Sequence, residues 1–286
     1  MAKDVVICVK QVPDVTEVKI NPETHTLIRE GVPSVLNPFD EFVVEEAVRI
    51  KEQYGGTVTA VTMGPPQAEE VLKLCLQMGA DKGVLLCDQM LAGSDTWATS
   101  IALAALLKKM KYDLIICGQE TTDSSTAQIG PELAERIGIP QITFVNSIEL
   151  EEDGKKGTFR RETDKGYQIM ESRLPLLVTV VKGINEPRAP EKGRERGKKI
   201  EKISASDIGV GENTVGVDGS PTRVVQINAA KPKVRAQLVV DSSLPAHERI
   251  RLIMMGGIQQ KEDSTRLDGD AADMAKRAGE FILDLV

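Results

Sequence analysis

Short apolar runs alternate with longer amphipathic stretches through the first half of the chain. Four of the runs have the length of a strand and are rich in Val, Ile, Leu and Thr, which is typical of strands buried on both faces of a sheet. These runs are residues 5–9, 57–63, 83–87 and 114–117. They predict four central strands.

Helical patterns lie between these strands. Asn37 and Pro38 open the first helix, because Asn is favoured at the N-cap and Pro at the first helical position. Gly follows three of the predicted helices within two residues, as is common at helix ends. The predicted helices are residues 40–53, 67–78, 94–110 and 131–137. Strands and helices that alternate in this way predict a doubly wound parallel α/β sheet.

The pattern changes after residue 140. Residues 141–149 and 167–171 are predicted strands on either side of a turn at 153–157, and 174–181 is a further apolar strand. We therefore expect an antiparallel addition to the sheet. Residues 183–202 are irregular and basic, either as a solvated loop or as a protruding segment that meets a partner. The last predicted element is a helix at 270–285.

Composition narrows the function classes. The 286 residues are 41% hydrophobic and only 3% aromatic, and their net charge is −7. An acidic chain with few aromatic residues is a poor nucleic-acid binder. Four cysteines without a CxxC pair and two histidines predict neither a metal site nor a catalytic triad. No run has transmembrane length, and residues 5–9 are too short for a signal peptide, so a cytoplasmic protein is expected.

The most informative polar stretch is residues 118–130, GQETTDSSTAQIG. It lies between a predicted strand and a predicted helix, where backbone N–H groups and hydroxyls favour anions such as phosphate. A carboxylate such as Asp123 could accept from a ribose hydroxyl or cap a turn. The alternative is an elaborate helix cap without a ligand. Neither GxGxxG after the first strand nor GxxxxGK[ST] is present, which disfavours a standard dinucleotide fold or a P-loop enzyme.

Four segments carry a resemblance to a known family. They are residues 8–14 (CVKQVPD), 37–49 (NPFDEFVVEEAVR), the loop 118–130, and the stretch from Arg161 to Arg188 that ends in NEPR. Over nearly its whole length the chain resembles the beta subunit of electron-transfer flavoproteins. The resemblance implies a nucleotide-binding α/β domain over residues 1–200. Residues 201–286 would form an extended C-terminal arm and a helix that pack on the alpha subunit.

The resemblance also implies cofactors and partners. An alpha subunit would carry an FAD that serves an acyl-CoA dehydrogenase or a related flavoenzyme. The beta subunit would hold AMP as a structural ligand or, in the electron-bifurcating branch, a second FAD that takes electrons from NADH. That branch sends one electron to a high-potential acceptor and one to ferredoxin or flavodoxin. The chain would thus be an electron-transfer protein that oxidises NADH only as part of a complex.

Two features favour FAD over AMP. The loop ending in residues 126–131 (TAQIGP) is similar to the bifurcating and nitrogen-fixation-associated branches, and the chain is longer than the mitochondrial type at its C-terminal end. A third feature concerns partners. The mitochondrial type docks through a leucine in the loop after NEPR, whereas residues 189–196 here (APEKGRER) contain none. A conventional subunit with AMP and a non-redox nucleotide-binding regulator are the alternatives.

The resemblance assigns the nucleotide contacts residue by residue. Backbone at Val9 and Met63 would meet the adenine edge, and the hydroxyl loop would hold phosphates. Asn37 and Asp40 would contact the nucleotide or cap their helix. No catalytic residue is expected. The full set is Val9, Lys10, Asn37, Asp40, Met63, Gly64, Gly118, Thr122, Asp123, Ser124, Ser125, Thr126, Gln128 and Ile129.

Overall fold

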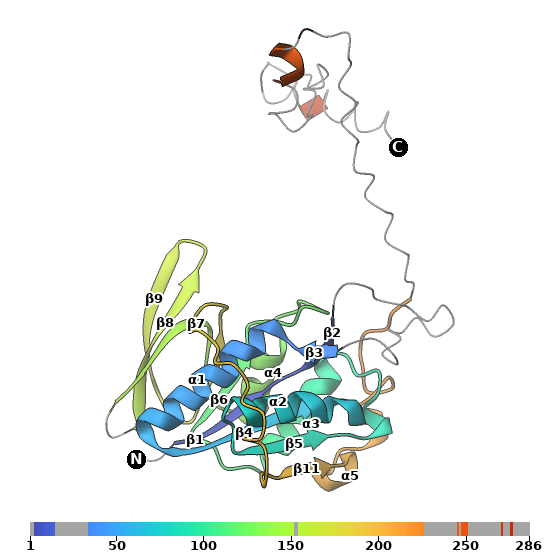
Figure 1. The fold of residues 1–286 in the computed structure, drawn as a ribbon. Coiled ribbons are helices and arrows are strands. Elements are labelled where there is room, and N and C mark those ends of the chain that lie inside the picture. Colours follow the sequence, from blue (N-terminus) through green and yellow to red (C-terminus); the bar gives the residue numbers. More distant parts are fainter. Residues whose placement is uncertain are drawn as a thin grey trace. The chain divides into compact units, whose positions relative to one another are not determined.

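The computed structural model describes residues 3–14, 34–151 and 154–225, together with 245, 247–250, 270 and 275–276. The chain divides into two compact units, Met1–Ile227 and Asn228–Val286. The first unit contains the sheet (Figure 1). The predicted helix at 270–285 lies outside the described residues, apart from 270, 275 and 276. The first unit continues past residue 200, where the sequence suggested a boundary.

Nine strands form one sheet in the order β11-β5-β4-β1-β6-β10-β7-β8-β9. All pairs from β11 to β7 are parallel, whereas β7, β8 and β9 pair antiparallel. A separate antiparallel pair joins β2 (Gln11–Pro13) to β3 (Ser34–Leu36). The predicted parallel α/β sheet with an antiparallel addition is confirmed. The strands are β1 (Lys3–Cys8), β4 (Gly56–Met63), β5 (Lys82–Leu86), β6 (Leu114–Gly118), β7 (Gln141–Leu150), β8 (Lys156–Thr163), β9 (Gly166–Arg173), β10 (Leu176–Val180) and β11 (Ile200–Ile203).

Helices cover both faces of the parallel strands (Figure 1). Consecutive residues of one strand, such as Ile115 and Ile116 of β6, enter two different core clusters, because side chains alternate between the faces of a sheet. The first cluster contains residues of α1 (Pro38–Tyr54) and α2 (Glu69–Met78). The second contains residues of α3 (Thr96–Leu107), α4 (Ile129–Ile137) and α5 (Ala205–Ile208). Short 3-10 turns are η1 (Pro66–Ala68), η2 (Gln89–Leu91) and η3 (Glu212–Thr214).

Two strands contradict the sequence prediction. Strand β8 begins inside the predicted turn at 153–157. The sequence did not predict this strand, because it is polar and has few buried apolar positions besides Phe159. Strand β11 lies in the segment predicted to be irregular. It pairs with β5 alone at the edge of the sheet, so it needs no continuous apolar run. None of the described helices is long and apolar enough to cross a membrane.

Candidate nucleotide-binding site

The loop at 118–130 leaves the sheet where the strand order reverses. Strand β1 has β4 on one side and β6 on the other, and the chain winds outward from β1 in both directions. Ligands of open parallel sheets bind at this switch point, beyond the carboxyl ends of the strands. Lys10 follows β1 and Asp123 lies in the loop after β6, and their side chains form an ion pair with a 2.6 Å separation between Nζ and Oδ2.

Lys10 is held at both ends by carboxylates. Its backbone N–H donates to Asp40 Oδ2 at 2.7 Å, and its ammonium donates to the two oxygens of Asp123 at 2.8 and 2.6 Å. The Thr121 hydroxyl donates to the same Asp123 carboxylate at 2.7 Å. A ribose hydroxyl, one of the two partners expected for Asp123, would therefore have to share that carboxylate with two donors from the chain itself.

Asn37 joins helix α1 to the loop. The side-chain cap expected of this residue is not formed. Instead its Nδ2 donates to the Glu120 carbonyl at 3.0 Å, and its Oδ1 accepts from the Thr122 N–H at 3.3 Å. The side chain is completely buried. Asn37 thus satisfies two backbone groups of a loop that lies more than eighty positions away in the sequence.

Asp40 is a buried carboxylate beneath the same loop. Only 3% of the residue is exposed. Burial raises the pKa of Asp40 to about 7, and hydrogen bonds from the Lys10 N–H and Asn37 and the Lys10 charge offset this only in part. A Cβ at Gly118 would come within 2.5 Å of Asp40 Oδ1. The close approach of this carboxylate therefore explains why glycine begins the loop.

Four hydroxyl-bearing residues of the loop are exposed, namely Thr122, Ser124, Ser125 and Thr126. Ser125 and the nearby Ala127 have left-handed backbone conformations, with φ of 50° and 57°. Residues other than glycine rarely adopt this region, and such strain is frequent at ligand clamps. The exposed hydroxyls and the start of α4 just beyond them form a donor set that suits phosphate oxygens.

The other residues predicted to contact the nucleotide lie at the same edge of the sheet, and each already bonds to or packs against other residues of the chain. The Val9 N–H donates to the Val61 carbonyl at 2.9 Å, and the Gly64 N–H donates to the Leu86 carbonyl at 3.1 Å. Gln128 accepts from the Thr96 hydroxyl at 3.1 Å. Met63 and Ile129 pack against the second core cluster. Contact of these five residues with a nucleotide remains a prediction.

The stretch NEPR fastens the chain after β10 to helix α1. Asn185 Nδ2 donates to the Phe42 carbonyl at 3.0 Å and to Glu46 at 2.9 Å. Arg188 lies between two carboxylates, with Nε 2.7 Å from Glu45 and one terminal nitrogen 2.6 Å from Glu52. Asn37 precedes helix α1, and Asp40 lies in its first turn. The same helix therefore positions both the candidate site and the start of the loop at 189–196.

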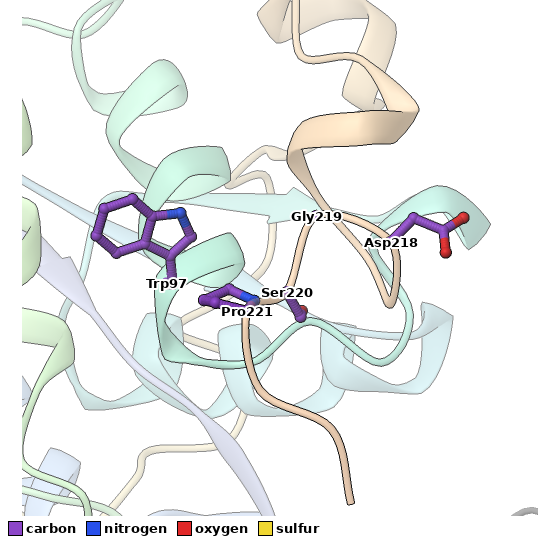
Figure 2. A pocket seen from close by; sticks show the side chains of 5 residues that line it. All are labelled: Trp97, Asp218, Gly219, Ser220 and Pro221. Atoms are coloured by element: carbon purple, nitrogen blue, oxygen red, sulfur yellow. The ribbon is translucent and has the colours of Figure 1, made fainter.

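A second cluster of bonds, which the sequence did not reveal, lies next to the loop. Asp95 caps α3 through the Ala98 N–H at 3.0 Å and accepts from the Thr222 hydroxyl at 2.7 Å. The Asp95 N–H donates to Ser220 Oγ at 2.9 Å. Figure 2 shows the Trp97 ring beside Pro221 at a small hollow, with the Asp218 carboxylate pointing away from both. No sequence motif indicates this junction, because its partners are more than a hundred residues apart.

The described part of the chain offers little support for a metal site or for a reactive cysteine. It contains no group of His, Cys, Asp and Glu side chains able to hold a metal ion. All four cysteines are free, with Cys75 and Cys117 buried and Cys8 and Cys87 partly buried. Burial raises the pKa of the Cys75 thiol. A hydrogen bond with Cys8, together with burial, raises the pKa of Cys117. Thiols of this kind are unreactive.

The sheet order and the bridged loops define an open, doubly wound α/β protein with a candidate ligand site at the switch in strand order. Comparison with known proteins gives the family. Residues 24–208 match the electron transfer flavoprotein domain. The chain belongs to the electron transfer flavoprotein beta-subunit family.

Relatives with different names cover most of the chain. An electron transfer flavoprotein subunit beta from Thermoanaerobacterium thermosaccharolyticum is 46% identical over 226 residues, which is 78% of this chain and 86% of the relative. The caffeyl-CoA reductase-Etf complex subunit CarD of Acetobacterium woodii is 42% identical over 84% of this chain and 93% of its own. Protein FixA of Azotobacter vinelandii is 40% identical over 83% of this chain and 88% of its own. Beta subunits of this family partner with an alpha subunit.

Proposed function

We propose that this chain is the beta subunit of an alpha/beta electron-transfer complex and that its site at 118–130 takes FAD. The observation that carries the proposal is the network around Lys10. It brings the loop after β1, the start of α1 and the loop after β6 together at the switch point. The family resemblance of the TAQIGP ending and the similarity to chains named FixA and CarD favour FAD over AMP.

The residues present fit the ADP portion of FAD. Exposed hydroxyls of Thr122, Ser124, Ser125 and Thr126 would donate to the phosphates. The Lys10–Asp123 ion pair ties the loop after β1 to the hydroxyl loop, and Asn37 keeps the loop backbone in place. When bound, FAD would supply the chemistry of accepting electrons from NADH and passing them on singly, while the protein binds and orients it.

Electrons would leave in two directions. One would reach an acyl-CoA dehydrogenase or a related flavoenzyme through the alpha-subunit FAD, and the other would reach ferredoxin or flavodoxin. The loop at 189–196 is held at both of its ends. Arg188 pairs with Glu45 and Glu52 of α1, and the Lys198 ammonium donates to the carbonyls of Leu76 and Ala80. A segment fixed in this way suits contact with a partner protein, through charge rather than through a leucine.

The flavin content of the purified alpha/beta complex tests the proposal. Two FAD per heterodimer are expected, together with reduction of the flavin by NADH. One FAD plus one released AMP would instead identify a conventional subunit. A chain that is monodisperse alone and co-purifies with no alpha subunit would point to the non-redox alternative.

Substitution of loop hydroxyls tests the site itself. Ser124→Ala with Ser125→Ala removes two exposed hydroxyls, which bond to Thr121 in the free chain, and leaves the Lys10–Asp123 pair intact. Each hydrogen bond to a charged group contributes about 1.5 kcal/mol or more, so nucleotide retention should fall by roughly a hundredfold. The matched control is Asp164→Ala with Ser172→Ala on the β8–β9 hairpin. Equal nucleotide content in both variants would contradict the site assignment.

A further inference from the structure

Asp40 occupies a position in which ionisation is unfavourable. It lies in the first turn of α1 and is almost completely buried. Its Oδ2 accepts the backbone N–H of Lys10 at 2.7 Å, and its Oδ1 approaches Gly118 so closely that no Cβ would fit there. The carboxylate therefore supports the first residues of both loops that form the candidate site.

The charge of Lys10, which favours ionised Asp40, is opposed by the charge of Asp123. The Lys10 ammonium is paired with Asp123, so the cation nearest to Asp40 is neutralised by its own partner. Asp123 itself raises the pKa of Asp40 through its negative charge. The thiols of Cys75 on α2 and Cys117 on β6 also face Asp40, and their raised pKa values keep them neutral. Asp40 thus lacks a dedicated cation among the described residues that surround it.

We propose that Asp40 is a positioning residue that makes nucleotide binding at the loop proton-linked, so that the bound phosphates favour its neutral carboxyl form. The inference rests on the proposed function, because it requires a nucleotide in this loop. Phosphates held by the loop hydroxyls add negative charge close to a buried carboxylate that has little opposing charge. A proton taken from solvent onto an Asp40 oxygen removes that repulsion and leaves the other carboxyl oxygen to accept the Lys10 N–H.

The sign of the effect follows from linkage. Binding raises the pKa of Asp40, so the nucleotide complex holds more protons than the free chain near neutral pH. Affinity should therefore be highest below neutrality, where Asp40 is already protonated, and should decrease as the pH rises through the pKa of about 7. A merely structural Asp40 would leave affinity independent of pH.

FAD is the appropriate probe, because its pyrophosphate is a diester without a titration near neutrality. Calorimetric titration of the full chain with FAD, at about pH 6 and about pH 8.5, should show affinity at least roughly threefold weaker at the higher pH. Repeating the titration near pH 7.5 in two buffers of different ionisation enthalpy should show net proton uptake. Asp40→Asn should abolish both effects.

Glu41→Gln is the matched control, because it makes the same charge change one residue further along α1 on an exposed side chain. It should keep the pH dependence of the natural chain. FAD binding with equal affinity at both pH values and no proton uptake would overturn the proton linkage and leave the proposed function standing. So would an Asp40→Asn variant that keeps the full pH dependence. The uptake measurement on the natural chain decides the matter even if the variant does not fold. Absence of FAD binding at either pH would overturn the proposed function, and the linkage with it.

Discussion

Asp40→Asn is expected to stabilise the first compact unit at alkaline pH, although most substitutions of buried residues destabilise. Burial raises the pKa of Asp40 from 3.8 to about 7, so folding at high pH removes an ionised carboxylate from water. A shift of this size corresponds to at most about 4 kcal/mol. Asn is similar in shape, keeps an oxygen that can accept the Lys10 N–H and carries no charge. We expect a gain of about 2 to 4 kcal/mol above neutral pH.

The pH profile identifies the cause. A group whose pKa is raised on folding stabilises the protein fully below its unfolded value and loses that contribution as the pH rises through the folded value. The difference between variant and natural chain should therefore be near zero at about pH 4 and reach its full size above about pH 7. Urea unfolding followed by the fluorescence of Trp97, the single tryptophan, measures it.

Glu41→Gln provides the control for stability. Partial burial raises the pKa of this first-turn carboxyl, whereas the helix N-terminus favours its charge. The two effects oppose each other on an exposed side chain, so Glu41→Gln should change stability by less than about 1 kcal/mol in either direction. An Asp40→Asn variant that is less stable than the natural chain at about pH 8.5 would show that the charged form makes net favourable contacts. Such a result would contradict both the stability prediction and the reasoning behind the proton linkage.

The central parallel strands could be predicted from the sequence, because a strand that is buried on both faces of the sheet needs a continuous apolar run. The strands at Val5, Thr57, Gly83 and Leu114 were predicted within a few residues of their bounds. Edge strands carry no such requirement. Strand β11 has a partner on one side only, and β8, although paired on both sides, has half of its residues exposed. Their sequences therefore resemble loops, and only the pairing partners show them to be strands.

The location of the candidate site could be predicted from the sequence, but the hydrogen-bond partners of its polar residues could not. A polar run between a strand and a helix marks the loop at 118–130. Whether Asn37 caps its helix or bonds to Glu120 and Thr122 depends on which strands are neighbours in the sheet. No local sequence pattern predicts that strand order. The hydrogen-bond partner of Asp40 could not be predicted either, because it is the N–H of Lys10 in the loop after β1.

Arg188→Ala is expected to lower the free energy of unfolding by about 3 kcal/mol. The Glu45 side chain is only 8% exposed and accepts from the Nε and a terminal nitrogen of Arg188. Removal of the guanidinium leaves a nearly buried carboxylate without this partner, which is far more costly than loss of a surface ion pair. The Arg188 backbone N–H, which also donates to Glu45 at 3.1 Å, would compensate only in part. Arg188→Lys should recover a minor share, because an ammonium cannot reproduce the forked contacts to two carboxylates.

Arg194→Ala is the matched control. Arg194 pairs with Glu191 at 2.9 Å, but these side chains are 39% and 66% exposed, so the loss should be below about 1 kcal/mol. Urea unfolding of both variants, followed by Trp97 fluorescence, separates the two cases. Asn37 and Asp40 lie at the start of helix α1, and loss of the Arg188 contacts to Glu45 and Glu52 leaves the rest of that helix less firmly held. The Arg188 variant should therefore also retain less nucleotide than the Arg194 variant. Equal stability of the two variants would show that Glu45 finds water or another cation when Arg188 is absent.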